Sequence, residues 1–566
     1  MNKNGKKIGA SVLAMLLMMS SASLVACGDG KTIGEEVDAN RSQLYVMNFN
    51  GGYGNIWIEK VKERFEEAYK DVSYESGKTG VQIMIQPAKE KGAGLDLKGS
   101  NCEVFFGEEV PYFSYVSQNM LLSLDDVVET VIAQDGVDLS EHQKKSLTAL
   151  DGHYYALPHN ETGAGLIYDK DLFNEKQLYI NRAHDDYVAW EQYNAEDPED
   201  YDLSEGPDGV FGTIDDGLPA TMEEFFALCD YMKEDKGVTP FVVTGGSAPK
   251  YSANLVNRVA AAYNGYETTL ANYTFSAEDV EVITDKDSIV KADNALGYTY
   301  ETTTVDIDNT NGYLLRQTVG KLYGLAFLNK MIDGDYFYSP AMGSGVSQLM
   351  AQAYFLNSKF INEPIAMLVE GIWWENEADN AGTFADCDRN YVNAAKKDRN
   401  FGFMPMPTRI DENDTNTKGN PYCSYDMYSS YAFAKKTTSE WKIKLIKDFL
   451  KFTYSAAELE EYTKLVGVPR AMEYNLSTDA YNSLTTFGKD LWDSHKAGQA
   501  VVQLSDNRLY YENESDHDSL VLLAANGITY PYTAFAKSSP TSVKNYFTGT
   551  WMKEDKWNDK YSKYFS

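Results

Sequence analysis

Residues 43–49 read Gln-Leu-Tyr-Val-Met-Asn-Phe, and Asn50-Gly51-Gly52 follows them directly. Such a nearly continuous run of β-forming residues is typical of a strand that is covered on both faces. The Asn-Gly-Gly triplet ends the run, because these residues favour turns. Next, Ile58, Val61 and Phe65 recur at intervals of three and four, which predicts an amphipathic helix. The stretch therefore predicts a buried strand followed by a helix.

The same unit repeats further along the chain. Residues 81–85 alternate as a second strand, and residues 104–106 form a third strand before the helical pattern of residues 112–122. Strands that alternate with helices predict an α/β sheet with parallel strands. Ligands of such sheets bind beyond the carboxyl ends of the strands. We therefore expect Asn50 and Glu108, each just past a strand, near a ligand, with ordinary turn formation as the alternative.

The first thirty residues have the pattern of an exported lipoprotein. Lys3, Lys6 and Lys7 precede an apolar stretch over residues 8–24, which is short for the ~20 residues that a spanning helix needs. The stretch is therefore interpreted as an export signal. It ends in Leu-Val-Ala-Cys at residues 24–27, which resembles a bacterial lipobox. We predict a lipid on Cys27, with a signal anchor and an incidental Cys as the alternative.

The charge balance restricts the partners. The 566 residues include 51 Lys and Arg against 84 Asp and Glu, a formal net charge of −33. Nucleic-acid binding normally needs clustered basic residues, so this balance argues against it. It also argues against an anionic membrane surface or a highly phosphorylated ligand. A neutral or cationic partner fits better.

The cysteines and histidines give no sign of a metal or nucleophile site. Apart from Cys27, the cysteines are scattered and form no C-x-x-C pair, and they are Cys102, Cys229, Cys387 and Cys423. Two disulfides and four buried thiols are both compatible with this spacing. The six histidines never fall at i, i+4, and the chain has no G-x-S-x-G, H-E-x-x-H, G-x-x-x-x-G-K-[ST] or G-x-G-x-x-G motif.

A family resemblance begins at residues 151–158, which read Asp-Gly-His-Tyr-Tyr-Ala-Leu-Pro, and continues at residues 165–173, Gly-Leu-Ile-Tyr-Asp-Lys-Asp-Leu-Phe. Together they resemble the D-G-K-x-Y-A-L-P…G-L-x-Y-N-K-D-L-F signature of family 1 of the extracellular solute-binding proteins. These proteins are the carbohydrate-capturing subunits of ABC importers. Further matches follow in the family's order at residues 220–225 (with Met222 where Trp is usual), 237–241, 366–374, 401–407 and 441–455.

The resemblance implies a two-lobed α/β fold of the periplasmic-binding-protein type II, with a mostly parallel sheet in each lobe and a ligand cleft at a hinge. The implied organisation is a signal peptide at 1–26, a tether at 27–42, lobe 1 at 43–157, lobe 2 at 158–405, a return to lobe 1 at 406–465 and a helical region at 466–566 mainly on lobe 2. Pro158 and the pair Pro405 and Pro407 fall at the implied crossings, where a fixed φ suits a defined connection.

Two segments, 174–217 and 266–311, are insertions relative to the family pattern. The second is polar, Thr-rich and alternating, which favours an added hairpin. The first contains carboxylates and glycines that together could wrap a hard cation such as Ca²⁺; the carboxylates are Asp202, Glu205, Asp208, Asp215 and Asp216. The alternative is a solvated acidic loop, because the spacing does not match an EF-hand. We expect no required cofactor.

Aromatic side chains carry the ligand hypothesis, since Tyr, Phe and Trp make up 13% of the chain. Flat rings can stack on the apolar faces of sugars while polar side chains take the hydroxyls. Trp373 and Trp374 are the first candidates, and by the resemblance one of them would form a stacking floor. Further candidates lie in loops after early strands, at the first crossing and in the returning segments, and they are Asn50, Tyr53, Glu108, Asn160, Glu161, Asp426 and Arg470.

The resemblance thus implies a lipid-anchored, extracellular, monomeric protein that captures a carbohydrate, an oligosaccharide given the insertions, and delivers it to ABC permease subunits. It is not expected to be an enzyme. Lipid tethering together with the acidic, Lys-poor composition favours a Gram-positive surface, with a Gram-negative periplasm as the alternative. Two alternatives stay open: a surface glycoside hydrolase, for which two carboxylates about 5–10 Å apart would suffice, and a glycan-binding adhesin or sensor.

Overall fold

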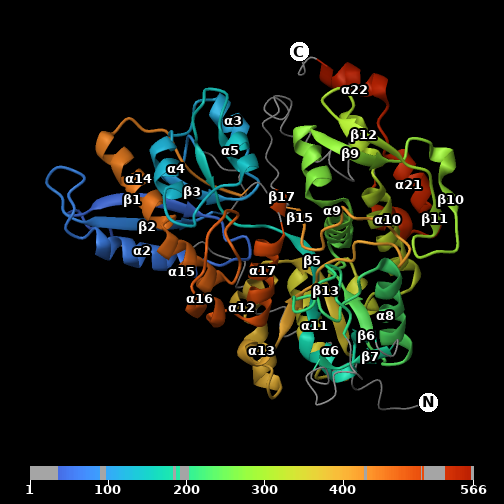
Figure 1. The fold of residues 1–566 in the computed structure, drawn as a ribbon. Coiled ribbons are helices and arrows are strands. Elements are labelled where there is room, and N and C mark those ends of the chain that lie inside the picture. The colour runs from blue at the N-terminus through green and yellow to red at the C-terminus, as the bar shows by residue number, and fades with distance from the viewer. Residues whose placement is uncertain are drawn as a thin grey trace.

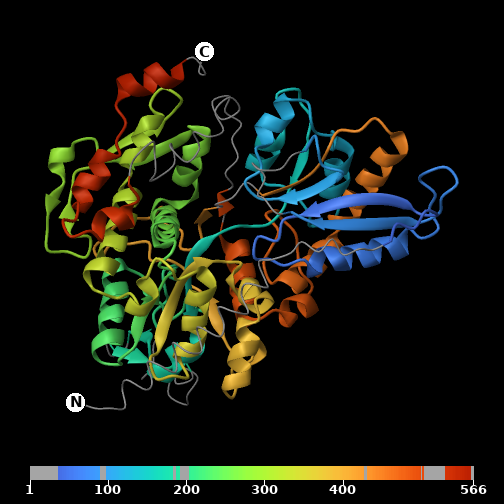
Figure 2. The same ribbon diagram turned by 180° about the vertical axis from the view of Figure 1, so that it is seen from behind.

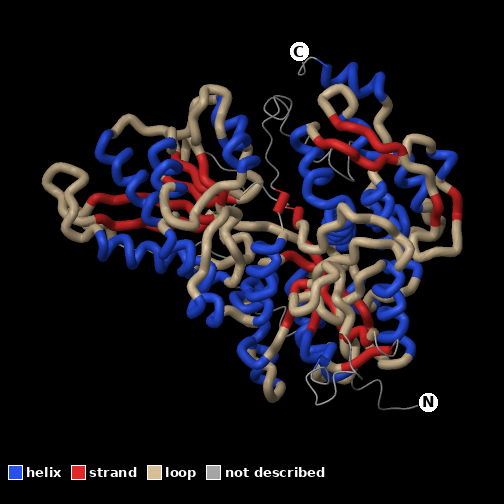
Figure 3. Tube along the Cα trace, in the orientation of Figure 1, coloured by secondary structure: helices blue, strands red, loops and turns tan. Residues whose placement is uncertain are grey.

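The computed structural model describes residues 36–88, 97–182, 186–190, 203–425, 430–498, 500–501 and 529–562. Its strands form two main sheets, which lie in separate halves of the molecule (Figure 1). Figure 3 shows the two groups of strands apart from each other, each with helices around it. The predicted α/β fold class is confirmed. The lipobox, Cys27 and the tether to residue 35 lie outside the described residues.

The first half is built on a five-stranded sheet with the order β2-β1-β3-β16-β4. Strand β1 (Ser42–Asn48) pairs in parallel with β2 (Val81–Pro87) and β3 (Val104–Gly107), and β16 (Tyr431–Ala434) pairs antiparallel with β3 and β4 (Ala156–Pro158). The helices of this half are α2 (Ile56–Ala68), α3 (Tyr112–Ser117), α4 (Asp125–Ile132), α5 (Glu141–Leu147), α14 (Glu440–Thr453), α15 (Ala456–Val466) and α16 (Thr478–Ser483).

The second half is built on a four-stranded sheet with the order β14-β5-β13-β8. Strand β13 (Ile365–Gly371) is parallel to β8 (Thr239–Val242) and antiparallel to β5 (Ala164–Asp169), which also pairs antiparallel with β14 (Phe401–Phe403). Its helices are α6 (Lys170–Lys176), α8 (Met222–Glu234), α9 (Ala248–Thr274), α10 (Val319–Asp333), α11 (Gln348–Ser358), α12 (Trp374–Asn380), α13 (Thr383–Asn390), α17 (Thr486–Ala497), α20 (Pro531–Phe535), α21 (Val543–Gly549) and α22 (Glu554–Tyr561).

Within the two main sheets, parallel pairing is confined to strands that alternate with helices, so both sheets are mixed. The antiparallel strands β4, β5, β14 and β16 adjoin connections between the halves. Of these, β5 and β16 run opposite to the parallel strands, and β4 and β14 pair with the reversed strands at the sheet edges. Strand–helix repeats in the sequence do not reveal such reversed strands.

The insertions add small antiparallel hairpins. Strand β6 (Tyr179–Asn181) pairs with β7 (Asp186–Val188), and β9 (Ala277–Val282) pairs with β12 (Thr303–Ile307). The second hairpin encloses the short pair of β10 (Val290–Lys291) and β11 (Tyr298–Thr299). Residues 266–274, predicted as part of this insertion, instead continue α9 beyond a non-helical Gly265. A last short pair joins β15 (Ser424–Tyr425) to β17 (Ala500–Val501).

Three segments connect the halves: residues 159–163, residues 404–430 and residues 467–485. The third segment includes α16, which packs on α15 of the first half. Figure 2 shows the first of them, in teal, running from one half to the other. They are hydrogen-bonded side by side. The His159 N–H donates to the Ser430 carbonyl (3.0 Å), and the Ala471 N–H donates to the His159 carbonyl (3.2 Å). We call these three segments the first, second and third crossing.

The core is also continuous across the crossings. One apolar cluster includes Leu44 and Val46 of β1 and extends to Trp373, Phe403 and Phe487 beyond the crossings. A second cluster, with Phe225 of α8 among its members, lies within the second half. Cys102, Cys229, Cys387 and Cys423 are buried free thiols. No helix among the described residues is long and apolar enough to cross a membrane.

Candidate functional site

The loop after β1 lies against the end of β3, as the predicted parallel sheet requires. The Asn50 side chain is exposed, and its Oδ1 accepts the N–H groups of Gly52 (3.1 Å) and Gly54 (3.0 Å). Asn50 therefore shapes the loop. Glu108 is buried beside Gly51, where a Cβ would clash with the Glu108 carboxylate.

The two tryptophans have different surroundings. Trp373 follows β13 and is 7% exposed, and its ring meets that of Tyr53 edge-on at 6.5 Å. A Cβ on Gly52 would lie 2.8 Å from Trp373 Cδ1, so the loop after β1 packs directly on this ring. Trp374 is fully buried among four phenylalanines, which are Phe355, Phe384, Phe401 and Phe487. Trp373 thus lies where the halves meet, whereas Trp374 is part of the core.

Glu161 links three parts of the molecule at the first crossing. Its carbonyl accepts the Tyr53 hydroxyl at 2.7 Å, and its carboxylate accepts His495 Nδ1–H from α17 at 2.9 Å. Burial lowers the pKa of His495, but the Glu161 carboxylate outweighs this effect, so the pKa is raised above 6.5. The Glu161 carboxylate therefore favours the charged form of the buried His495 imidazole.

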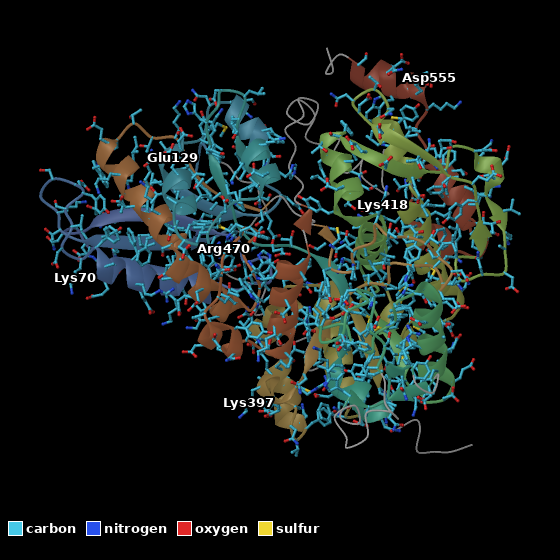
Figure 4. All side chains as sticks on the ribbon, viewed as in Figure 1. Lys70, Glu129, Lys397, Lys418, Arg470 and Asp555 are labelled. Carbon is cyan, nitrogen blue, oxygen red and sulfur yellow. The ribbon has the colours of Figure 1, made fainter. Side chains whose placement is uncertain are left out.

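Asn160 and Arg470 fasten the first crossing to α15 and to the third crossing, respectively. Asn160 Oδ1 accepts the Tyr462 hydroxyl at 2.5 Å. Arg470 is fully buried with its guanidinium 3.9 Å from the Tyr462 ring centre, and it donates to His159 Nδ1 at 2.6 Å. Burial and the Arg470 charge hold the pKa of His159 well below 6.5, so this imidazole is neutral and accepts the bond. Figure 4 shows Arg470 on the inner side of its half, toward the middle of the molecule.

A small cavity, partly open to solvent, lies where the three crossings meet the end of the second sheet. We call it the crossing cavity. Its lining residues are Glu161, Gly163, Ile372, Phe403, Tyr422, Ser424, Pro469, Leu491 and Ser494. The lining combines two aromatic rings with hydroxyl groups and one carboxylate. Such a surface suits a neutral ligand that has both apolar faces and hydroxyls.

Of the residues predicted for the ligand site, Glu161 lines this cavity. Tyr53 bonds the Glu161 carbonyl and meets the Trp373 ring where the halves contact each other. Asn50 and Glu108 lie in and beside the loop after β1. Asp426 lies outside the described residues. Sequence reasoning missed Phe403, Tyr422 and Ser494. Phe403 stood within the crossover match at residues 401–407, and this match was the one signal that pointed to it.

The acidic loop, residues 203–217, contacts the cavity wall. Asp208 Oδ2 and Asp215 Oδ1 lie 2.8 Å and 2.9 Å from the Tyr422 hydroxyl. Asp216 accepts the Gly212 N–H, and Glu205 is exposed. Asp202 lies outside the described residues. Within the described ranges no group of three or more acidic, His or Cys side chains could hold a metal ion, and calcium binding at this loop stays a prediction.

Comparison with known proteins finds a likeness only among solved structures. No model of a known protein family matches the chain. No curated protein matches it either. A chitin oligosaccharide binding protein is 15% identical with a TM-score of 0.49, over 93% of this chain and 100% of that one. The GacH receptor of Streptomyces glaucescens, solved without ligand and with acarbose, is 14% identical with a TM-score of 0.49, over 93% and 99%. A cyclic α-maltosyl-1,6-maltose binding protein from Arthrobacter globiformis is 13% identical with a TM-score of 0.48, over 92% and 100%.

Proposed function

We propose that this chain is an extracellular solute-binding lipoprotein that captures an oligosaccharide between its halves and delivers it to an ABC importer. The observation that carries the proposal is the crossing cavity, which is lined by residues of all three crossings and by residues of the second half. A ligand in this place contacts all three crossings and Ile372 after β13 together, so its binding energy acts directly on the relative position of the halves.

The cavity wall fits a carbohydrate. Phe403 and Tyr422 offer ring faces for the C–H faces of a sugar, and Ser424, Ser494 and Glu161 offer groups for its hydroxyls. Trp373 adds a large aromatic surface at the neighbouring contact. The Gly52 loop covers this ring, so a longer glycan reaches it only if the loop after β1 moves away.

Thermal unfolding of the full chain with maltotetraose, cellotetraose, xylotetraose, mannotetraose and chitotetraose tests the proposal. Ligand at about 1,000 times its dissociation constant adds about 4 kcal/mol to the stability of the folded state. We expect one glycan class to raise the midpoint by several degrees and to be recovered intact. Phe403→Ala should abolish the rise, whereas Phe226→Ala, a buried phenylalanine away from the cavity, should retain it.

Two results would overturn the proposal. A flat panel would remove carbohydrate as the ligand class, and cleavage of a glycan during the experiment would favour the hydrolase. The membrane anchor is tested separately. Cys27→Ala should release the chain from the membrane fraction into the medium, because the lipid would be attached through that sulfur. Retention of this variant in the membrane fraction would refute the lipoprotein assignment.

A further inference from the structure

Arg258 of α9 is a buried cation behind the wall of the crossing cavity. The residue is 2% exposed, and its guanidinium carbon lies 5.7 Å from the centre of the Phe403 ring, one of the two rings in the lining. Such a distance is typical of a cation–π contact. The guanidinium is therefore part of the layer that supports the cavity wall.

The same guanidinium holds the backbone on both sides of Tyr422, which is the other ring in the lining. It donates to the Pro421 carbonyl at 2.8 Å and also to the Cys423 carbonyl. Because these two carbonyls flank Tyr422 in the sequence, the two bonds fix the stretch of backbone from which the ring projects.

The Arg258 charge has no ion-pair partner among the described residues, and its Nε has no hydrogen-bond partner there. The carboxylate that acts on it most strongly is that of Glu161, which already accepts from His495. Burial, the largest effect, lowers the pKa of Arg258 to about 10, so the guanidinium is still charged at neutral pH. By contrast, the buried Arg399 pairs with Asp169 at 2.6 Å. A buried charge without such a partner costs stability, so the contribution of Arg258 lies in the two carbonyls that it bonds.

Helix α9 offers the second crossing further bonds next to Gly265, where the helix is interrupted. The Asn420 N–H donates to the Ala262 carbonyl at 2.8 Å, and Asn416 Nδ2 donates to the Tyr263 carbonyl at 2.9 Å. The short strand β15 also packs on α9 (Figure 1). This part of the second crossing is thus fastened along α9.

We propose that Arg258 is a positioning residue for Tyr422, which it fixes to α9 so that the Tyr422 and Phe403 rings form one rigid wall of the crossing cavity. Both rings then belong to the second half, and the halves can move without changing the distance between the rings. A ligand meets a preformed aromatic wall, which lowers the cost of ordering side chains on binding. The effect on ligand affinity rests on the proposed function, whereas the place of the Tyr422 ring in the free chain does not.

A fluorine label at position 422 tests the proposal without any ligand. The full chain carries 3-fluorotyrosine at this position alone, and its fluorine spectrum is compared with that of Arg258→Lys. Lysine keeps the charge, but its single nitrogen cannot replace the two nitrogens that reach the two carbonyls. We expect one narrow resonance in the wild type and a displaced or broadened resonance in Arg258→Lys. Arg399→Lys is the matched control and should leave the resonance unchanged, because the buried Arg399 contacts Asp169 and the Leu356 carbonyl instead.

The second measurement is affinity for the tetrasaccharide of the panel that raises the wild-type midpoint most. Arg258→Lys should weaken binding about tenfold or more, the effect of losing one hydrogen bond to a charged group. Tyr422→Ala should weaken binding by at least as much. The double variant should bind no more weakly than Tyr422→Ala, because Arg258 acts through this ring. A loss of stability alone would lower the unfolding midpoint of Arg258→Lys but would not produce this dependence on Tyr422.

Asn416→Ala decides the case if Arg258→Lys does not fold. Asn416 is only partly buried, and the change removes the bond from its Nδ2 to the Tyr263 carbonyl. It should displace or broaden the fluorine resonance. Asn413→Ala, at an exposed position of the same crossing, should not.

The outcomes are distinct. A resonance that is the same in the wild type and in Arg258→Lys overturns the proposal, as does an equal change in Arg399→Lys. If Arg258→Lys does not fold, an unchanged resonance in Asn416→Ala overturns it. Affinity losses of Arg258→Lys and Tyr422→Ala that simply add in the double variant also overturn it. If the resonance changes as expected but no glycan of the panel binds, the positioning role of Arg258 stands and the proposed function fails.

Discussion

At the scale of the residue, Tyr53 shows how one hydrogen bond joins distant segments. Its buried hydroxyl donates to the Glu161 carbonyl at 2.7 Å. Tyr53→Phe keeps the ring but removes the donor, and an unsatisfied buried carbonyl costs about 1–3 kcal/mol. We expect urea unfolding to show a loss of this size. Tyr155→Phe removes a hydroxyl bond to Asp151 at the surface and should cost less than about 0.5 kcal/mol. Equal losses in both variants would contradict a special role for the Tyr53 bond.

His495 gives a residue-scale prediction for pH. Its pKa is raised above 6.5 in the folded chain by the Glu161 carboxylate, which outweighs the effect of burial. A raised pKa means that the folded state binds the proton more tightly than the unfolded state. The stabilisation is therefore complete below pH 6.5 and is lost as pH rises through the folded value. The difference in unfolding free energy between wild type and His495→Gln should shrink over this range. If this difference in unfolding free energy stays constant between pH 6 and pH 9, the protonation of His495 is not coupled to folding through the pair.

At the scale of the element, the loop after β1 depends on glycine where it meets Trp373. Gly52 has φ +90°, and a Cβ there would lie 2.8 Å from Trp373 Cδ1. Gly77 has a similar φ of +82°, but no atom lies within 4 Å of its Cβ position. Both Gly→Ala variants carry the backbone strain of about 1–2 kcal/mol, and only Gly52→Ala adds the clash. We expect its unfolding midpoint in urea to be clearly lower than that of Gly77→Ala. Equal midpoints would mean that the loop can leave Trp373 at no cost.

The elements also show what the sequence could predict. Strand β1 and helix α2 were predicted closely. In β1 one face is buried and the other is half-buried, which leaves a nearly continuous β-forming run, and the buried face of α2 leaves apolar residues at intervals of three and four. The position of Glu108 past β3 followed from the same logic. The contact of Tyr422 with Asp208 and Asp215 joins residues more than 200 positions apart. No local period encodes such a contact, since it depends on how an inserted loop folds back over the second crossing.

At the scale of the whole molecule, the apolar core runs from the first sheet through the crossings to Phe403 and Phe487. Two halves with separate cores would unfold independently. Here both halves contribute side chains to one apolar cluster. When one half unfolds, apolar side chains of the other half therefore lose their packing partners and become exposed to water. The Tyr53–Glu161 hydrogen bond and the Glu161–His495 ion pair reinforce this link from both sides of the first crossing. The halves are therefore coupled in stability although each has its own sheet.

This coupling predicts a single transition when the ligand-free chain is unfolded by heat in a calorimeter. Phe403 is buried against Gly165 of β5 within the shared cluster, so Phe403→Ala should cost about 3–5 kcal/mol and divide the transition into two. Phe226 is buried in the separate cluster of the second half. Phe226→Ala should not divide the transition in this way, because it leaves the shared cluster intact. Two transitions in the wild type, or one undivided transition in Phe403→Ala, would show that the crossings connect the halves without coupling their stability. In that case a bound glycan would stabilise only the part of the chain around the cavity. If the halves are coupled, a single bound glycan should stabilise both of them together.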